Sequence, residues 1–97
     1  MNLHDFTINR VELNYDKTTI VDFFGYDINK SAGRIQFLDV KLFECKLDNG
    51  YSMGATIIVD IEDEVLPDGT VLYRINQSIG PSYTIICREA RSWLDIQ

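Results

Sequence analysis

Five carboxylates within nine positions are the strongest chemical signal in the sequence: Asp60, Glu62, Asp63, Glu64 and Asp68. Carboxylate oxygens bind hard cations, and paired carboxyl groups hydrolyse glycosides. On an extended strand, however, every second side chain projects about 6.6 Å from the previous one, so the oxygens form a row instead of converging on one ion. The spacing also lacks the Asp-x-Asp-x-Asp-Gly pattern of a calcium loop. The cluster is therefore interpreted as a solvated face or a binding surface for a basic partner.

Other residue combinations that support catalysis or cofactor binding are missing from the sequence. His4 is the only histidine, so any histidine-dependent triad would have to use it, and no Gly-x-Ser-x-Gly elbow is present. The segment Lys-Thr-Thr at residues 17–19 lacks the glycines of a phosphate-binding loop. We therefore expect no catalytic, cofactor-binding or metal-binding residues, and a protein that is not an enzyme.

The two cysteines, Cys45 and Cys87, are interpreted as small buried side chains. A disulfide between them is the alternative, and it would require their Cα atoms to lie within about 7 Å of each other. A zinc site is disfavoured, because it needs four ligands and only one histidine accompanies the two thiols.

Negative charge extends over the whole chain, which has 97 residues and a formal net charge of −6. Such a chain repels phosphates and anionic membrane surfaces, so we expect no direct contact with nucleic acid or with a membrane. No stretch reaches the roughly 20 apolar residues of a membrane helix, and the first residues do not resemble a signal peptide, so the cytoplasm is the expected location. The partner that the charge favours is a basic protein.

These side chains must be positioned by β-strands, because apolar residues alternate with a period of two along most of the chain. A slip in the alternation near Asn9 and Arg10 predicts a bulge in the first strand. A short helix is the alternative for residues 89–97, although a strand running to about residue 93 is favoured. The expected fold is one all-β domain over residues 1–97, an antiparallel meander that forms a small sandwich or a partly open barrel. Turn signals divide it into about six strands, at residues 6–13, 18–28, 34–47, 57–65, 71–79 and 82–93.

Two turn signals predict how the middle strands pair. Asn49-Gly50 favours a two-residue hairpin. In that register the facing pairs are Leu42 and Ile57, Val40 and Val59, and Leu38 and Ile61. Pro67-Asp68-Gly69 favours a second turn, after which Val65 faces Val71 and Glu62 faces Arg74. The apolar phase changes within residues 34–47, so that strand must bulge, twist sharply or be covered on both faces.

Two aromatic residues join the acidic cluster as candidates for contact with a partner. Tyr51 follows the Asn49-Gly50 turn, and Trp93 is the only tryptophan in the chain. Tyrosine and tryptophan are enriched at the centres of protein interfaces. The alternative for Trp93 is that its ring closes one edge of the core.

Two segments resemble small all-β bacterial immunity proteins. Residues 33–45, Gly-Arg-Ile-Gln-Phe-Leu-Asp-Val-Lys-Leu-Phe-Glu-Cys, are similar to a recurrent segment of these proteins, and residues 82–87, Ser-Tyr-Thr-Ile-Ile-Cys, are similar to their final strand. Immunity proteins of this kind neutralise polymorphic toxins inside the producing cell. The resemblance implies an all-β fold and a toxin as the partner, and it implies no catalytic residues.

Together these observations predict a non-enzymatic acidic inhibitor that binds and occludes a bacterial toxin. One alternative is a phage-encoded inhibitor of a host defence nuclease, which uses the same physics against a different basic target. Another is a small structural or assembly module, which would associate with itself through an exposed strand edge. The sequence leaves the oligomeric state open.

Overall fold

The structure is a computed structural model that describes residues 6–27, 29, 31–46, 58–77 and 81–94. The regular elements of the described residues are all strands, which confirms the all-β class. They are β1 (Thr7–Asp16), β2 (Thr18–Tyr26), β3 (Ala32–Leu38), β4 (Leu42–Lys46), β5 (Ile58–Val65), β6 (Val71–Gln77), β7 (Ser82–Cys87) and β8 (Glu89–Leu94). The last of these confirms a strand where a helix was the alternative.

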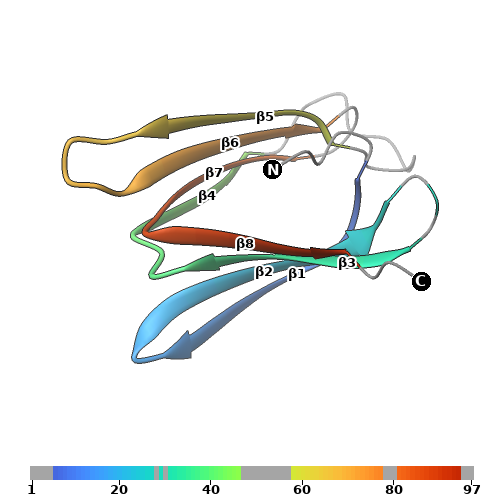
Figure 1. Ribbon diagram of the computed structural model, residues 1–97, viewed down its shortest axis with the longest axis horizontal. Coiled ribbons are helices and arrows are strands. Elements are labelled where there is room, and N and C mark those ends of the chain that lie inside the picture. Colours follow the sequence, from blue (N-terminus) through green and yellow to red (C-terminus); the bar gives the residue numbers. More distant parts are fainter. Residues whose placement is uncertain (1–5, 28, 30, 47–57, 78–80, 95–97) are drawn as a thin grey trace.

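The strands form a sandwich of two four-stranded antiparallel sheets. Sheet A has the order β1-β2-β3-β8, and sheet B has the order β4-β7-β6-β5. Figure 1 shows the two sheets as separate layers that are joined where β7 leads into β8 and β3 leads into β4. On the same side of the view, the β1–β2 and β5–β6 hairpin ends project away from each other.

The described residues form eight strands instead of the expected six because two long strands bend from one sheet into the other. β3 continues into β4, and β7 continues into β8, through short bends. The bent strands remain paired on both sides of the bend, with Leu38 opposite Glu89 and Leu42 opposite Ile86. Between these pairs the three residues 39–41 oppose the two residues 87–88, so the corner contains one extra residue, as in a β-bulge. This corner explains the change of apolar phase within residues 34–47.

The hairpin expected between residues 38–42 and 57–61 is wrong. β4 pairs with β7, and β5 pairs with β6, so β4 and β5 lie at opposite edges of sheet B. Residues 49–50, which carry the turn signal, are outside the described residues. A turn signal is only a local preference, whereas pairing Phe43 with Ile85 buries apolar side chains on the core face of two strands.

The second expected hairpin is confirmed in register. Val65 faces Val71, and Glu62 faces Arg74. The β-bulge expected near Asn9 and Arg10 is also confirmed, because the β1–β2 register shifts between Ile8 and Arg10.

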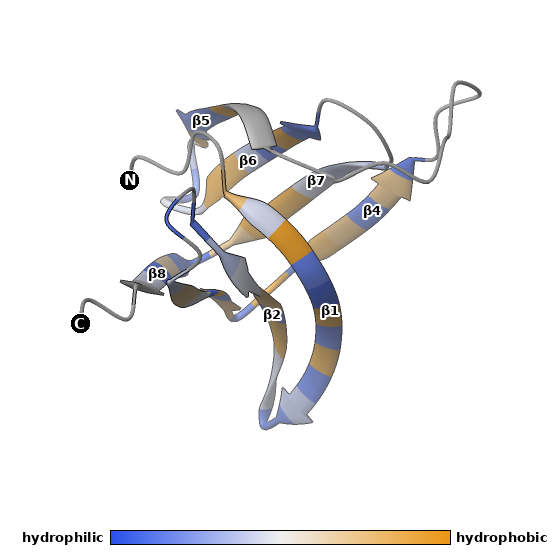
Figure 2. Cartoon of the chain, turned by 90° about the vertical axis from the view of Figure 1, so that its right-hand side faces the viewer, coloured by the Kyte–Doolittle hydropathy of each residue, from blue (hydrophilic) through white to orange (hydrophobic). Residues whose placement is uncertain are grey.

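The core lies between the inner faces of the two sheets and is rich in aromatic rings. Phe23 of sheet A lies 5.4 Å from Phe37, 4.8 Å from Tyr83 and 6.4 Å from Phe43 between ring centroids, so it joins the two sheets. Figure 2 shows the alternation that produces this arrangement, with hydrophobic and hydrophilic bands following one another along β1. The fully or nearly buried apolar residues are Phe6, Ile8, Val21, Phe23, Ile35, Phe37, Ile75, Tyr83, Ile85 and Cys87.

Candidate functional site

The acidic cluster does not form one surface. Glu62 and Glu64 are exposed on the outer face of β5, because the intervening position faces Tyr73, which packs on the core side of β6. Asp63 is exposed on the other side of the strand, opposite Tyr73 and on the side of the core. Asp60 is a residue of β5 and pairs with Asn76, and only its backbone is part of the described structure. Of the acidic row expected along β5, the structure therefore describes two carboxylates, those of Glu62 and Glu64.

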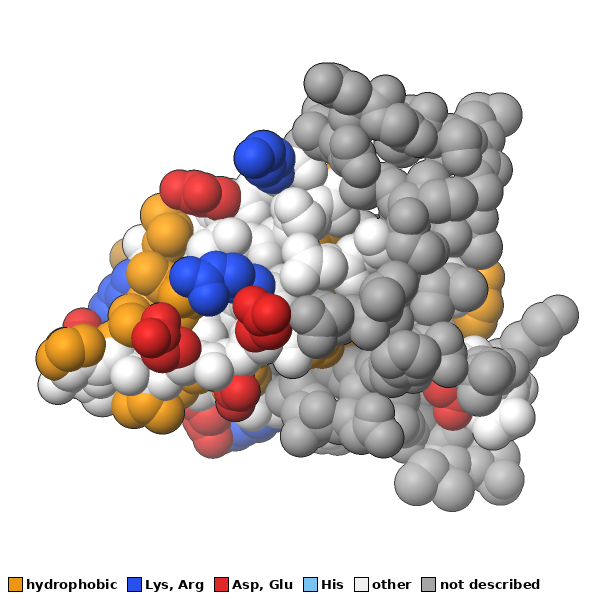
Figure 3. All heavy atoms as spheres, turned by 90° about the horizontal axis from the view of Figure 1, so that it is seen from above, with side chains coloured by type: hydrophobic (Ala, Val, Ile, Leu, Met, Phe, Trp, Pro, Cys, Tyr) orange, Lys and Arg blue, Asp and Glu red, His pale blue; other side chains and the backbone are white. Residues whose placement is uncertain are grey.

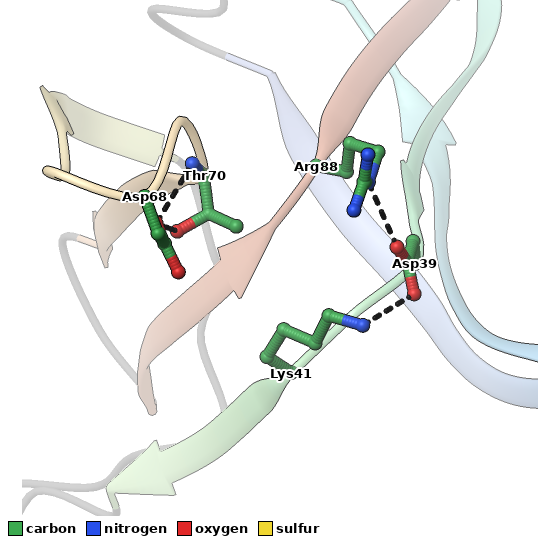
Figure 4. A network of polar contacts seen from close by, with 5 residues as sticks. All are labelled: Asp39, Lys41, Asp68, Thr70 and Arg88. Atoms are coloured by element: carbon green, nitrogen blue, oxygen red, sulfur yellow. Dashed lines mark hydrogen bonds and ion pairs between the residues drawn. The ribbon is translucent and has the colours of Figure 1, made fainter.

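Asp68 has a structural role in the turn between β5 and β6. Its Oδ1 accepts hydrogen bonds from the Thr70 backbone N–H at 3.0 Å and from the Thr70 hydroxyl at 2.5 Å (Figure 4). Chiefly because of the hydroxyl bond, the pKa of Asp68 is held below its usual value. The same turn places Gly69 at a φ of 89°, in the left-handed region that glycine tolerates. These bonds occupy Oδ1 of Asp68 within its own turn.

Glu62 interacts weakly with a cation of the neighbouring strand. Its Oε2 lies 4.0 Å from Nη1 of Arg74, and both side chains are about half exposed. An exposed ion pair of this kind contributes under about 1 kcal/mol to stability. For Glu64, the described residues provide no ion pair, and its cross-strand neighbour is Leu72.

Next to these carboxylates, three apolar residues form a row across the outer face of sheet B. Leu42 of β4 faces Ile86 of β7, and Ile86 faces Leu72 of β6; we call these three residues the apolar row. Leu42 is 36% exposed, and the other two are partly exposed. The row ends at Glu64 on β5. Figure 3 views this side of the molecule and shows hydrophobic side chains gathered at one end, with carboxylates and cations among them.

A second line of polar residues lies beside the apolar row. Glu44 of β4 faces Thr84, Thr84 faces Arg74, and Arg74 faces Glu62. The apolar row is thus flanked by carboxylates at both edges of sheet B. Among the described residues no element covers this face. The apolar row could not be recognised from the sequence, because the expected hairpin paired Leu42 with residue 57 instead of Ile86.

At the corner between the sheets, one carboxylate forms ion pairs with two cations. Asp39 receives hydrogen bonds from Nζ of Lys41 at 2.9 Å and from Nε of Arg88 at 3.0 Å (Figure 4). Mainly because of the Lys41 bond, the pKa of Asp39 is lowered. Asp39 has a φ of 54°, and the backbone N–H of Arg88 donates to the Leu38 carbonyl at 3.1 Å. These contacts hold the two bent strands together, so we assign this cluster to the fold.

The outer face of sheet A contains a buried carboxylate that sequence reasoning also missed. Asp22 is 2% exposed, and it accepts hydrogen bonds from Nε of Arg34 at 2.9 Å and from Nδ2 of Asn14 at 3.3 Å. The guanidinium carbons of Arg10 and Arg34 lie 4.4 and 5.4 Å from the Phe24 ring centroid. The signal in the sequence is one aspartate between two buried apolar residues. Its bonds satisfy a buried charge and indicate a structural role.

One small depression lies at the other end of the sandwich. It has a volume of about 230 Å³ and is lined by the β1 bulge together with Gln77, Pro81 and Tyr83. The Gln77 side chain donates to the Pro81 carbonyl, while its Oε1 has no hydrogen-bond partner in the structure as described. Small-molecule sites usually measure roughly 300–1,000 Å³, so this depression is below the normal size.

The two thiols have different surroundings. Cys87 is fully buried, and burial raises the pKa of its thiol to about 11. Cys45 is exposed, which corrects the expectation that both are buried, because it lies on the edge strand β4. Both cysteines are free, so the disulfide alternative is wrong.

The two aromatic candidates for partner contact stay predictions. Tyr51 is outside the described residues. The backbone of Trp93 belongs to β8, opposite Arg34, and its side chain is outside the description. In the described part of the chain, no group of three or more histidine, cysteine, aspartate or glutamate side chains could hold a metal ion. That part also contains no helix able to cross a membrane.

Comparisons with family models, with curated proteins and with solved structures find no match to this chain.

Proposed function

We propose that this protein is a non-enzymatic inhibitor of the bacterial immunity type, which binds a basic toxin through the outer face of sheet B. The observation that carries the proposal is the apolar row, which lies uncovered by described elements and ends at Glu64. Carboxylates Glu62 and Glu44 stand beside it on the two edge strands. An apolar centre with a charged rim is the usual composition of a protein interface.

The two parts of this face have different tasks in the proposed mechanism. The apolar row loses water on binding and supplies contact area. The carboxylates attract a basic surface over a distance, which speeds encounter and makes it depend on salt. A toxin that acts on nucleic acid has a basic substrate cleft, because that cleft must hold phosphates. Covering the cleft with this face would exclude the substrate without any chemical step.

A host defence nuclease offers the same kind of basic cleft, so a phage-encoded inhibitor remains the second candidate for the same face. The identity of the inhibited protein distinguishes the two. The partner would be recovered from the native host with the tagged chain at low salt, and it would be tested for an activity that one equivalent of this protein blocks.

The decisive measurement is the association rate of the recovered partner with charge variants. The double variant Glu62→Gln/Glu64→Gln should slow association about tenfold at low salt and should change little at high salt. The matched control is Glu12→Gln/Glu89→Gln, which removes the same charge from the outer face of sheet A. Equal association rates for both double variants would contradict the proposed face.

A further inference from the structure

β5 is one of the two edge strands of sheet B, and β4 is the other. β5 pairs with β6 along one side, and in the described residues no strand pairs with its other side. An edge strand presents N–H and C=O groups that an extended segment can use to join the sheet. The register of β5 shifts between Ile58 and Asp60, so the regular part of this edge runs from Asp60 to Val65.

The two sides of β5 differ in chemistry. Glu62 and Glu64 are exposed on the outer side. Ile61 and Val65 lie on the inner side, where Ile61 packs against the core and Val65 is 74% exposed. Asp63 lies between them on this side. An added strand would therefore meet two carboxylates on one side, and two apolar side chains separated by one carboxylate on the other.

We propose that the partner adds a strand to the edge of β5 that no described strand pairs with, and that this added strand has the pattern apolar, basic, hydrogen-bond donor, basic, apolar. The inference rests on the proposed function and specifies how the partner is recognised. Opposite charges directly across a strand pair stabilise the pairing, and so do facing apolar side chains. The two basic residues face Glu62 and Glu64, the donor faces Asp63, and the apolar residues face Ile61 and Val65.

The same charges oppose association between two copies of this edge. If β5 paired with β5 of a second copy, the three consecutive carboxylates would face one another at close range. Like charges directly across a strand pair destabilise it. Charged side chains on edge strands commonly prevent such pairing. The edge is thus selective for a basic strand from another protein.

The test uses the whole protein and two synthetic peptides of equal composition. The first has the core valine–lysine–threonine–lysine–valine, and the second has the same residues with the lysines adjacent. We expect the alternating peptide to bind about tenfold more tightly, because only it matches both sides of β5. Hydrogen exchange measured by NMR should show new protection at every second amide of residues 60–65. Only every second N–H points to the open edge, where an added strand would bond to it, and the others point to β6.

Proline variants provide an independent check, because proline removes one N–H from the strand. Backbone N–H groups of β5 point alternately toward β6 and toward the open edge of the sheet. One of the two variants Asp63→Pro and Glu64→Pro therefore loses a hydrogen bond to β6, and the other loses only an N–H at the open edge. The variant that keeps the wild-type unfolding midpoint should lose the preference for the alternating peptide. The matched alanine variant loses the same carboxylate but keeps the N–H, so it should keep more of the preference than the proline variant does; equal losses in the two variants would contradict strand addition.

The outcomes separate this inference from the proposed function. Equal, salt-dependent binding of both peptides would overturn strand addition and leave the acidic face intact. Protection at the edge of β1 instead of β5 would also overturn strand addition. Absence of binding by either peptide at low salt would overturn both.

Discussion

At the scale of single residues, carboxylates of similar appearance in the sequence do different work. Asp22, Asp39 and Asp68 are engaged by their own chain, whereas Glu62 and Glu64 lie exposed on an edge strand. The sequence predicted the acidic row but could not separate these roles. The partners that distinguish them are Arg88, 49 residues away from Asp39, and Arg34, 12 residues away from Asp22. Contacts over such separations depend on the fold and not on local pattern.

The engaged aspartates predict how stability depends on pH. Their hydrogen bonds, from Lys41 to Asp39 and from Thr70 to Asp68, lower both pKa values below 3.8 in the folded protein. As the pH falls, the unfolded chain takes up protons first, so the stabilisation is complete above pH 3.8 and is lost below it. Urea midpoints measured from about pH 6 down to about pH 2.5 should therefore fall at the acidic end.

The control for this effect is the double variant Asp39→Asn/Asp68→Asn. It should be less stable than the wild type near neutral pH and should lose less stability on acidification, because its amides do not titrate. If both proteins lost stability in parallel, these two aspartates would not be responsible.

At the scale of elements, isolated hairpins could be predicted, and long-range pairing could not. The β5–β6 register followed from a turn signal and a cross-strand charge pair, Glu62 with Arg74. The partner of β4 is β7, about forty residues further along the chain, and no local signal identifies it. The corner at residues 39–41 appeared in the sequence only as a change of apolar phase. The apolar row was missed for the same reason.

Gly25 lies beside the β1 bulge, where the backbone of β1 leaves no room for a side chain. A Cβ at this position would lie 1.8 Å from the Thr7 carbonyl oxygen and 2.9 Å from Cε1 of Phe6. Because the obstructing atom belongs to the backbone, Gly25→Ala should destabilise the protein by about 3 kcal/mol. The measurement is the free energy of unfolding in urea.

Gly69→Ala is the comparison for Gly25→Ala. Gly69 has open space around its Cα, but its φ of 89° disfavours a side chain. This variant should cost about 1 kcal/mol through backbone conformation alone. A Gly25→Ala protein as stable as Gly69→Ala would show that the bulge relaxes without cost.

At the scale of the whole molecule, the sandwich is held by aromatic rings that lie between the two sheets. Neighbouring side chains of a strand point to opposite faces, so Phe23 and Phe24 of β2 lie on different sides of sheet A. Phe23 is fully buried, while Phe24 lies against Arg10 and Arg34 on the outer face of sheet A. The period-two alternation was thus enough to predict the class of the fold, whereas the order of the strands could be read only from the structure.

These neighbouring phenylalanines allow a matched test of the core. Phe23→Ala should cost about 4 kcal/mol, because it leaves a cavity among the rings of Phe37, Phe43 and Tyr83. Phe24→Ala should cost about 1 kcal/mol, because it loses mainly the two cation–π contacts. Thermal and urea unfolding of the two variants measure the difference, and similar losses would contradict the assigned core.

The bent ribbon of β3–β4 and β7–β8 also bears on how the chain folds. Its pairs join residues 33–46 with residues 82–94, so neither sheet can be completed until most of the chain has been synthesised. Closing loops of this length before their contacts form slows folding. The β1–β2 hairpin needs only local closure and can form early. During synthesis, the edges of β3 and β4 therefore stay unpaired until β7 and β8 have been made. Over that time the nascent chain exposes strand edges that can aggregate, although these edges are paired in the finished fold.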